Sequence, residues 1–291
     1  MLRYLSERRG PEAVLATTRR AREGWLQLDF AELATIEQAA ALLDGYELDG
    51  IYCVAGMTAV DACEDEPELA FRTNARGPGV LAAYAQQRAV PFVYFSTEYV
   101  FDGAADHPGP YGEDAAVRPL SVYGKSKLAG EEAVGAACAG ALVLRTTVVY
   151  GPDAREKNYL YSLMRNLATG TAMRVPEDQV STPTYNVDLI GAALGLVECG
   201  ASGVFHVCGP ELLGRLQFAE AVAERLGLDR SLLEGVSTAE LGQRAPRPLA
   251  AGLATGKLRS LYPQLRMRSV AEAMEDCAGE MAGFLDEVRR G

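Results

Sequence analysis

Ser121-Val122-Tyr123-Gly124-Lys125-Ser126-Lys127-Leu128-Ala129-Gly130-Glu131 predicts a helix that lies downstream of an apolar, strand-like run ending in Ser96 and Thr97. A tyrosine and a lysine four residues apart share one face of a helix. A free phenol titrates near pH 10, and a neighbouring ammonium group favours the phenolate and lowers that pKa. A hydroxyl from Ser96 or Thr97 would then hold a carbonyl or alcohol oxygen beside Tyr123. Such a set suits carbonyl reduction with a nicotinamide cofactor.

Strands and helices alternate around this stretch. Apolar runs predict strands at residues 13–17, 50–55, 91–96 and 141–145. Helical patterns predict helices at residues 36–43 and about 67–88, and a helix carrying Tyr123 that runs to about Cys138. This order predicts an α/β fold with a doubly wound, mostly parallel sheet. Ligands of such sheets bind beyond the carboxyl ends of the strands, where Ala55-Gly56, Ser96-Thr97 and Thr146-Thr147 would meet.

The pattern changes after about Tyr150, where Gly151-Pro152 breaks the chain. Further helices are expected near residues 157–169, 186–198, 217–226 and 270–288. We therefore expect a first domain over residues 1–150 and a smaller substrate-binding part over residues 151–291, with the last helix packing back on the body.

Composition narrows the class of protein. The chain has 291 residues, of which 48% are hydrophobic and 23% charged, as is typical of a globular enzyme. A formal net charge of −11 makes nucleic acid a poor partner, although a local basic pocket can still hold a nucleotide. No apolar run is long enough to span a membrane, and the N-terminus lacks the pattern of a signal peptide. We expect a cytoplasmic protein.

Metal and disulfide chemistry are not expected. The six cysteines are dispersed without a C-x-x-C pair, and Cys53 and Cys208 fall in apolar runs typical of buried, reduced thiols. The two histidines, His107 and His206, are too few and too far apart in the sequence to suggest a metal site. His206 lies within an apolar run and is expected in the core.

Motifs in a fixed order resemble one family. The chain is similar to extended short-chain dehydrogenase/reductases, and specifically to the dTDP-4-dehydrorhamnose reductase family of sugar-nucleotide reductases. The resemblance extends from about Glu12 onward. It rests on residues 55–61, 64–70 with Asn74, 95–103, 110–114, 119–127, 144–152, 178–184 and 247–258. It implies a Rossmann-like fold, a nicotinamide cofactor and a deoxy-sugar ketone attached to a nucleoside diphosphate as substrate.

The resemblance also implies roles for single residues. Tyr123 would be the general acid, and Lys127 its electrostatic partner and a contact of the nicotinamide ribose. Thr97 would orient the carbonyl, with Ser96 as the alternative. Ala55 and Gly56 would lie on the cofactor side. Substrate-side positions would be Thr58, Thr97, Gln179 and Thr184, although Gln179 and Thr184 could instead serve only the architecture of their loop.

The N-terminal region departs from the family pattern. The first 49 residues contain Gly10, Gly24 and Gly45, but no G-x-x-G-x-x-G turn of the kind that lets a backbone approach a pyrophosphate. Residues 1–10 resemble the last turns of the family's first helix. We expect either that the recorded start lies downstream of the true one, which we favour, or that another segment or a partner chain completes the sheet. A homodimer is a further possibility.

Other cofactor contacts are expected near the N-terminus. Arg19 and Arg20 follow the first predicted strand and could pair with the 2′-phosphate of NADP, which favours NADP over NAD. A solvated charge pair is the alternative. Asp29 and Phe30 resemble the segment beside the adenine, where Asp29 could accept the adenine amino group or remain an exposed loop carboxylate.

Three functions are compatible with these features. The first is an active reductase of a nucleotide-linked keto-deoxysugar. The second is a non-catalytic NADP-binding regulatory subunit, because the beta subunit of methionine adenosyltransferase resembles the same family. The third is an epimerase or dehydratase of the same superfamily, because dehydratases usually have an acid–base pair beside the serine or threonine and Glu98 follows Thr97. The reductase family resembled here also has an acidic residue at this position, so Glu98 does not discriminate between the two.

Overall fold

The computed structural model describes residues 1–290. The chain divides into two compact units that alternate along the sequence. The first unit comprises Met1–Val100, Val117–Arg145 and Ala193–Phe205, and the second comprises Phe101–Ala116, Thr146–Ala192 and the chain from His206 onward. The division into residues 1–150 and 151–291 stays a prediction.

A four-stranded sheet is the centre of the first unit. Its strands are β3 (Ile51–Cys53), β4 (Phe92–Thr97), β5 (Leu142–Thr146) and β10 (Gly203–His206), in the order β10-β5-β4-β3. β3 and β4 are parallel, with Ile51 opposite Phe92. Three of the four predicted strands are therefore neighbours in one sheet, and the carboxyl ends of β3 and β4 lie at the same edge.

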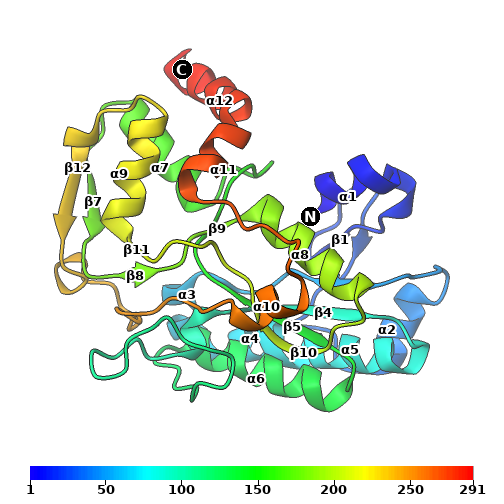
Figure 1. Cartoon of the computed structure of the whole chain (residues 1–291). Helices are drawn as coiled ribbons and strands as arrows, with labels where there is room; N and C mark the ends of the chain where they lie inside the picture. The colour runs from blue at the N-terminus through cyan, green and yellow to red at the C-terminus, as the bar shows by residue number, and fades with distance from the viewer. Residues whose placement is uncertain (291) are drawn as a thin grey trace. The chain divides into compact units, whose positions relative to one another are not determined.

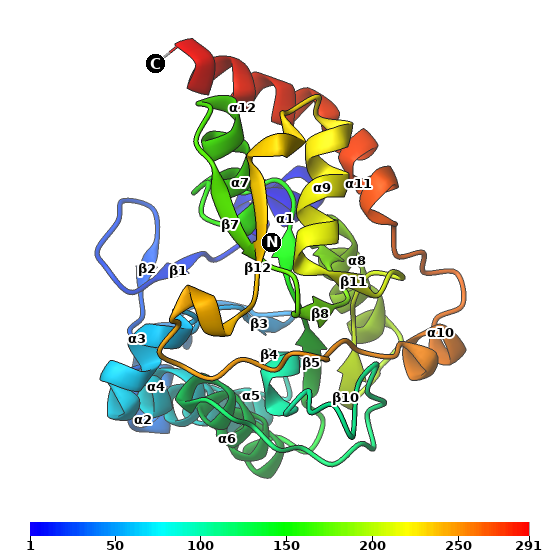
Figure 2. The ribbon, with the colours of Figure 1, turned by 90° about the vertical axis from the view of Figure 1, so that its left-hand side faces the viewer.

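The first unit also contains helices. They are α1 (Leu2–Arg9), α2 (Ile36–Leu43), α3 (Val60–Asp65), α4 (Pro67–Phe71), α5 (Gly77–Arg88) and α6 (Val122–Ala137), with short 3₁₀ turns η1 (Pro11–Ala13) and η3 (Glu98–Val100). α5 and α6 run side by side along one face (Figures 1 and 2). α2 begins where the sequence predicts, because Thr35 and Gln38 form a capping box there.

The predicted strand at residues 13–17 is wrong. Residues 11–13 form η1, and only β1 (Thr17–Thr18) is extended, paired in parallel with β2 (Leu26–Gln27) as a separate two-stranded sheet. An apolar run becomes a strand only where a neighbouring strand satisfies its backbone groups. In the described part of the chain, β3 ends the four-stranded sheet and residues 13–17 do not pair with it.

The predicted helix at residues 67–88 is interrupted. A π-helical segment, η2 (Arg72–Arg76), separates α4 from α5. Pro78 has no N–H to donate to the carbonyl of Asn74 four residues earlier. The hydroxyl of Tyr94 on β4 donates to that carbonyl instead, at 2.6 Å. The irregular turn thereby fixes the helix to the sheet.

The second unit has smaller sheets and its own core. β6 (Val149–Tyr150) pairs with β9 (Thr184–Tyr185), β7 (Met173–Pro176) with β12 (Leu233–Val236), and β8 (Val180–Ser181) with β11 (Leu213–Gly214). Its helices include α7 (Tyr159–Ala168), α9 (Arg215–Arg225), α10 (Gly256–Leu261), α11 (Val270–Asp276) and α12 (Ala278–Arg290), with 3₁₀ turns η4 (Arg230–Leu232) and η5 (Ala239–Leu241). α8 (Asn186–Glu198) passes from this unit into the first. Phe218, Tyr150 and Phe284 belong to this core.

Several side-chain expectations can be checked directly. His206 is fully buried, as expected. All six cysteines are free, and Cys53 and Cys208 are buried. Over residues 1–290, no helix is both long and apolar enough to cross a bilayer, and no three His, Cys, Asp or Glu side chains gather as metal ligands would.

Candidate active site

Two capping contacts fix the start of α6, where Tyr123 lies. The Ser121 hydroxyl accepts a hydrogen bond from the N–H of Gly124 at 3.2 Å. The carboxylate of Glu64 on α3 accepts one from the N–H of Val122 at 2.8 Å. Both satisfy amides that a helix start leaves unpaired, and a carboxylate is also favoured at the positive end of the helix dipole. Tyr123 is therefore held in an ordered first turn.

Thr97 and Tyr123 meet at the carboxyl end of β4. Both are buried, and their side chains lie close to one another. The Thr97 hydroxyl also accepts the N–H of Tyr99, whose ring lies edge-on to that of Tyr123 with centroids 5.4 Å apart. Burial raises the pKa of Tyr123, and the Thr97 hydroxyl only partly opposes it. The prediction of a lowered pKa is wrong because burial outweighs the influence of the neighbouring groups, so the phenol keeps its proton at neutral pH.

Lys127 lies one helical turn beyond Tyr123 and is also buried, with 4% of its surface exposed. Its ammonium nitrogen lies 4.0 Å from the centroid of the Tyr94 ring, a favourable cation–π distance. Burial lowers its pKa to about 8, while the nearby Cys53 and Glu131 act in the opposite direction. The side chain is thus a cation at neutral pH that can lose its charge in mildly alkaline solution.

The structure distinguishes Thr97 from Ser96. The Ser96 hydroxyl donates to a carboxylate oxygen of Glu131 at 2.5 Å. That carboxylate forms a buried ion pair with Arg145 on β5, with a shortest N–O distance of 2.6 Å. The Ser96 hydroxyl is therefore occupied by its hydrogen bond to Glu131, whereas the Thr97 side chain lies beside the Tyr123 phenol. Of the two hydroxyls, Thr97 therefore remains the candidate for orienting a carbonyl.

Asn74 lies in a stretch that resembles the family, but its positioning role is visible only in the structure. It is fully buried in η2, where its side-chain oxygen accepts the N–H of Met57 at 2.8 Å and its amide nitrogen donates to the carbonyl of Met57 at 3.0 Å. The same nitrogen donates to the Ser126 hydroxyl on α6 at 2.9 Å. Asn74 thus ties the loop after β3 to the helix that carries Tyr123. An asparagine followed four residues later by proline was the available signal.

The expected cofactor residues all lie in the first unit. Ala55 and Gly56 follow β3, and Gly56 lies so close to Asn74 that an added Cβ would be 2.9 Å from its side-chain oxygen. Thr58 is exposed in the same loop. This loop and the Thr97–Tyr123 pair lie beyond neighbouring parallel strands, as predicted for the ligand-binding edge.

The N-terminal candidates have different surroundings. Arg19 and Arg20 are exposed and follow β1. The Asp29 carboxylate accepts the N–H of Ala31 at 2.9 Å, which closes a local turn, and Phe30 is buried. The exposed arginines are available to an anion, whereas Asp29 already has a backbone partner.

The donor set fits the nicotinamide end of a dinucleotide. The Tyr123 hydroxyl and the Lys127 ammonium are buried donors on one helix face, suited to the hydroxyls of a ribose. The two exposed arginines would suit a phosphate. These residues would hold a nicotinamide dinucleotide.

Gln179 and Thr184 lie in the second unit. The Gln179 amide donates to the Thr238 hydroxyl at 2.9 Å. Thr184 is fully buried, and its hydroxyl donates to the carbonyl of Thr182 at 3.2 Å. The structure therefore shows local partners for both residues.

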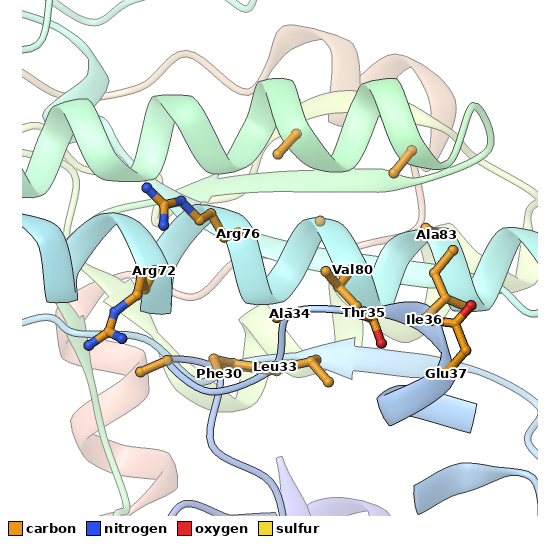
Figure 3. A pocket seen from close by; sticks show the side chains of 14 residues that line it. Phe30, Leu33, Ala34, Thr35, Ile36, Glu37, Arg72, Arg76, Val80 and Ala83 are labelled. Carbon is orange, nitrogen blue, oxygen red and sulfur yellow. The ribbon is translucent and has the colours of Figure 1, made fainter. Parts of the chain in front are cut away.

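A separate groove of about 590 Å³ lies beside α5 (Figure 3). Its walls come from residues 30–37, from α5 and η2, and from Ala133 and Ala137 on α6. Arg72 and Arg76 lie at one end of it (Figure 3). Phe30 is the one expected site residue in its lining, which contains none of Thr97, Tyr123 and Lys127. This groove is therefore separate from the Thr97, Tyr123 and Lys127 side chains.

Comparison with known proteins identifies the family of this chain. The family model described as the RmlD substrate binding domain matches residues 2–282. The chain belongs to this family. It is 38% identical over 239 residues to a dTDP-4-dehydrorhamnose reductase of Mycolicibacterium smegmatis, covering 81% of this chain and 71% of that protein. It is 36% identical to a probable low-salt glycan biosynthesis reductase of Haloferax volcanii, covering 75% and 73% of the two chains.

Solved structures of RmlD-family proteins confirm the Rossmann-like α/β fold. The crystal structure of dTDP-4-dehydrorhamnose reductase from Bacillus anthracis in complex with NADP has a TM-score of 0.79 with this chain. The two are 30% identical, and the match covers 87% of each chain. The family and fold predicted from the motifs are therefore confirmed.

Proposed function

We propose that this chain is an NADPH-dependent reductase of a nucleotide-linked keto-deoxysugar. The observation that carries the proposal is the buried pair of Thr97 and Tyr123, with Lys127 one turn further along the same helix face. Membership of the RmlD family and the reductase activity named for its relatives support the same reaction.

The chain supplies the proton and holds the reacting oxygen. When bound, a reduced nicotinamide supplies a hydride to the carbonyl carbon. Tyr123 donates its phenolic proton to the carbonyl oxygen, which becomes the hydroxyl of the alcohol product. Its raised pKa keeps that proton in place until the oxygen becomes basic. Thr97 orients the carbonyl oxygen beside the phenol, and the Lys127 ammonium stabilises the phenolate that remains.

The substrate-side residues are proposed from the family resemblance. Thr58 is exposed in the loop after β3, which supports contact with a sugar nucleotide. Gln179 and Thr184 are proposed on the same grounds, with their hydrogen bonds to Thr238 and Thr182 fixing their side chains.

Arg19 and Arg20 are proposed to select NADPH over NADH. A guanidinium group bound to phosphate contributes roughly 1.5–3 kcal/mol, so Arg19→Ala with Arg20→Ala should weaken NADPH binding by about tenfold or more. NADH binding should change little, because NADH lacks the 2′-phosphate. Arg22→Ala is the matched control, since Arg22 is exposed nearby but stacks on Trp25. An equal loss of NADH affinity would contradict the assignment.

The proposed reaction is tested by mixing the protein with NADPH and dTDP-4-dehydrorhamnose. Loss of the absorbance of reduced nicotinamide, with one alcohol formed per cofactor oxidised, is the expected result. Tight NADPH binding without turnover of this or other nucleotide-linked ketosugars would favour the non-catalytic binding protein. Water loss or epimerisation without net NADPH oxidation would favour the dehydratase or epimerase.

A further inference from the structure

Tyr123, Lys127 and Glu131 form a buried stripe along α6, each one turn from the next, with 9%, 4% and 8% of their surfaces exposed. Two residues of β4 lie opposite the stripe. The ring of Tyr94 lies under the Lys127 ammonium, and the Ser96 hydroxyl donates to Glu131. Tyr94 and Ser96 share one face of their strand because side chains two residues apart point to the same side.

Glu131 is held by more contacts than an ordinary helix residue. Arg145 approaches it with Nε at 2.9 Å from one carboxylate oxygen and a terminal nitrogen at 2.6 Å from the other. This two-pronged pairing, together with the Ser96 hydrogen bond, fixes the carboxylate in one orientation. A buried carboxylate so restrained acts as a fixed charge on its neighbours.

A negative charge at Glu131 favours the protonated form of the neighbouring Lys127. Its ammonium lies in a buried site, where loss of hydration disfavours the charged form. The ionisable groups that face it are Cys53 on β3, Tyr94 on β4 and Glu131 on α6. Further ionisable groups, near Tyr123, are Cys63 on α3 and Glu98 and Tyr99 on η3. Among the groups facing Lys127, Glu131 is the carboxylate that can offset its charge.

We propose that Glu131, held by Arg145 and Ser96, is a positioning residue that keeps Lys127 protonated for cofactor binding and for stabilising the Tyr123 phenolate. The mechanism above uses neither Glu131 nor Arg145. The inference rests on the proposed function, because it assigns Glu131 a role in that same site.

The test compares the pH dependence of NADPH binding, measured by fluorescence titration, and of kcat/KM in four proteins. In Glu131→Gln the alkaline limb of both profiles should move to lower pH by about one unit, the usual effect of one nearby opposite charge. Glu131→Asp keeps the negative charge, so its limb should stay with that of the wild type. Glu132→Gln changes an exposed neighbour on α6 and should leave both profiles in place.

A second variant is needed because Glu131→Gln leaves the buried Arg145 without its partner and could fail to fold. Replacing a buried ion pair by neutral side chains is often tolerated, so Glu131→Gln combined with Arg145→Met should fold. It lacks the Arg145 cation as well as the carboxylate, so its alkaline limb should move to lower pH by less than that of Glu131→Gln. A folded variant without Glu131 whose limb stays at the wild-type pH would overturn the proposal and leave the cluster a purely structural one. Failure of the wild type to bind or oxidise NADPH would instead refute the proposed function.

Discussion

Burial of Lys127 disfavours the charged form of its side chain, although the proposed mechanism needs that charge. Burial lowers its pKa to about 8, whereas a lysine of the unfolded chain titrates near 10.4. Between these values the unfolded chain binds more protons at this position than the folded one. The free energy of unfolding contributed by this group therefore rises with pH across that window, because the penalty for burying the charge is relieved.

Replacing Lys127 by Met should remove this pH dependence. The difference in the free energy of unfolding, wild type minus Lys127→Met, should increase by about 3 kcal/mol between pH 8 and pH 10.4, at roughly 1.4 kcal/mol per unit of pKa difference. Urea unfolding of both proteins across this range measures it, and the subtraction cancels the titration of tyrosines common to both. Parallel curves would show that Lys127 is not desolvated in the folded protein.

At the scale of residues, the spacing of Tyr123 and Lys127 identified them as candidates but did not predict the direction of the Tyr123 pKa shift. The i, i+4 relation placed Tyr123 and Lys127 on one helix face, and the structure agrees. The choice between Ser96 and Thr97 depended on Glu131 and Arg145, which are distant in sequence from both. The pKa of Tyr123 moved opposite to the prediction because burial outweighs the influence of nearby groups, a balance that no local pattern reveals.

α6 is the element on which the site depends, and its glycines show how closely it packs. A Cβ added at Gly130 would lie 2.2 Å from both the Asn74 carbonyl oxygen and the Tyr94 hydroxyl. At Gly135, in the same helix, an added Cβ would meet nothing within 4 Å. The first glycine therefore permits contact between α6, η2 and β4, whereas the second does not serve packing.

These two glycines give a matched pair of variants. Gly130→Ala should destabilise the protein by roughly 1–3 kcal/mol, because α6 must move away from backbone and ring atoms. Gly135→Ala should stabilise it by about 0.5–1 kcal/mol, because alanine lowers the entropy of the unfolded chain and favours helix. Urea unfolding of both variants measures the effects. If Gly130→Ala matched Gly135→Ala, the close approach of α6 to β4 would be disproved.

Elements with strong local signals were predicted well. α2 carries its capping box, and β4 and α6 were placed within a residue or two. The strand at residues 13–17 was mispredicted because its apolar residues do not reveal whether a pairing strand is adjacent. The break at η2 was missed because it depends on a hydroxyl from β4, which the local sequence does not contain.

At the scale of the whole molecule, the candidate cofactor residues gather in the first unit although the chain leaves and re-enters that unit. These residues come from segments that are well separated in sequence: Arg19, the loop after β3, Thr97 and α6. A ligand that binds them together should stabilise their folded arrangement.

NADPH should accordingly stabilise the protein against unfolding. At 100 times its dissociation constant it should add roughly 2.7 kcal/mol to the free energy of unfolding, provided that the unfolded chain does not bind it. Denaturant unfolding with and without NADPH measures this gain. No gain at saturating NADPH would show that these segments do not form a cofactor site.

The most direct test of the central claim is the turnover of Tyr123→Phe, measured alongside its affinity for NADPH. Removing the proton donor should lower kcat by about a hundredfold or more, while the dissociation constant of NADPH stays within a few-fold of the wild type. A variant that reduces the ketosugar at the wild-type rate would contradict the assignment of Tyr123 as the general acid.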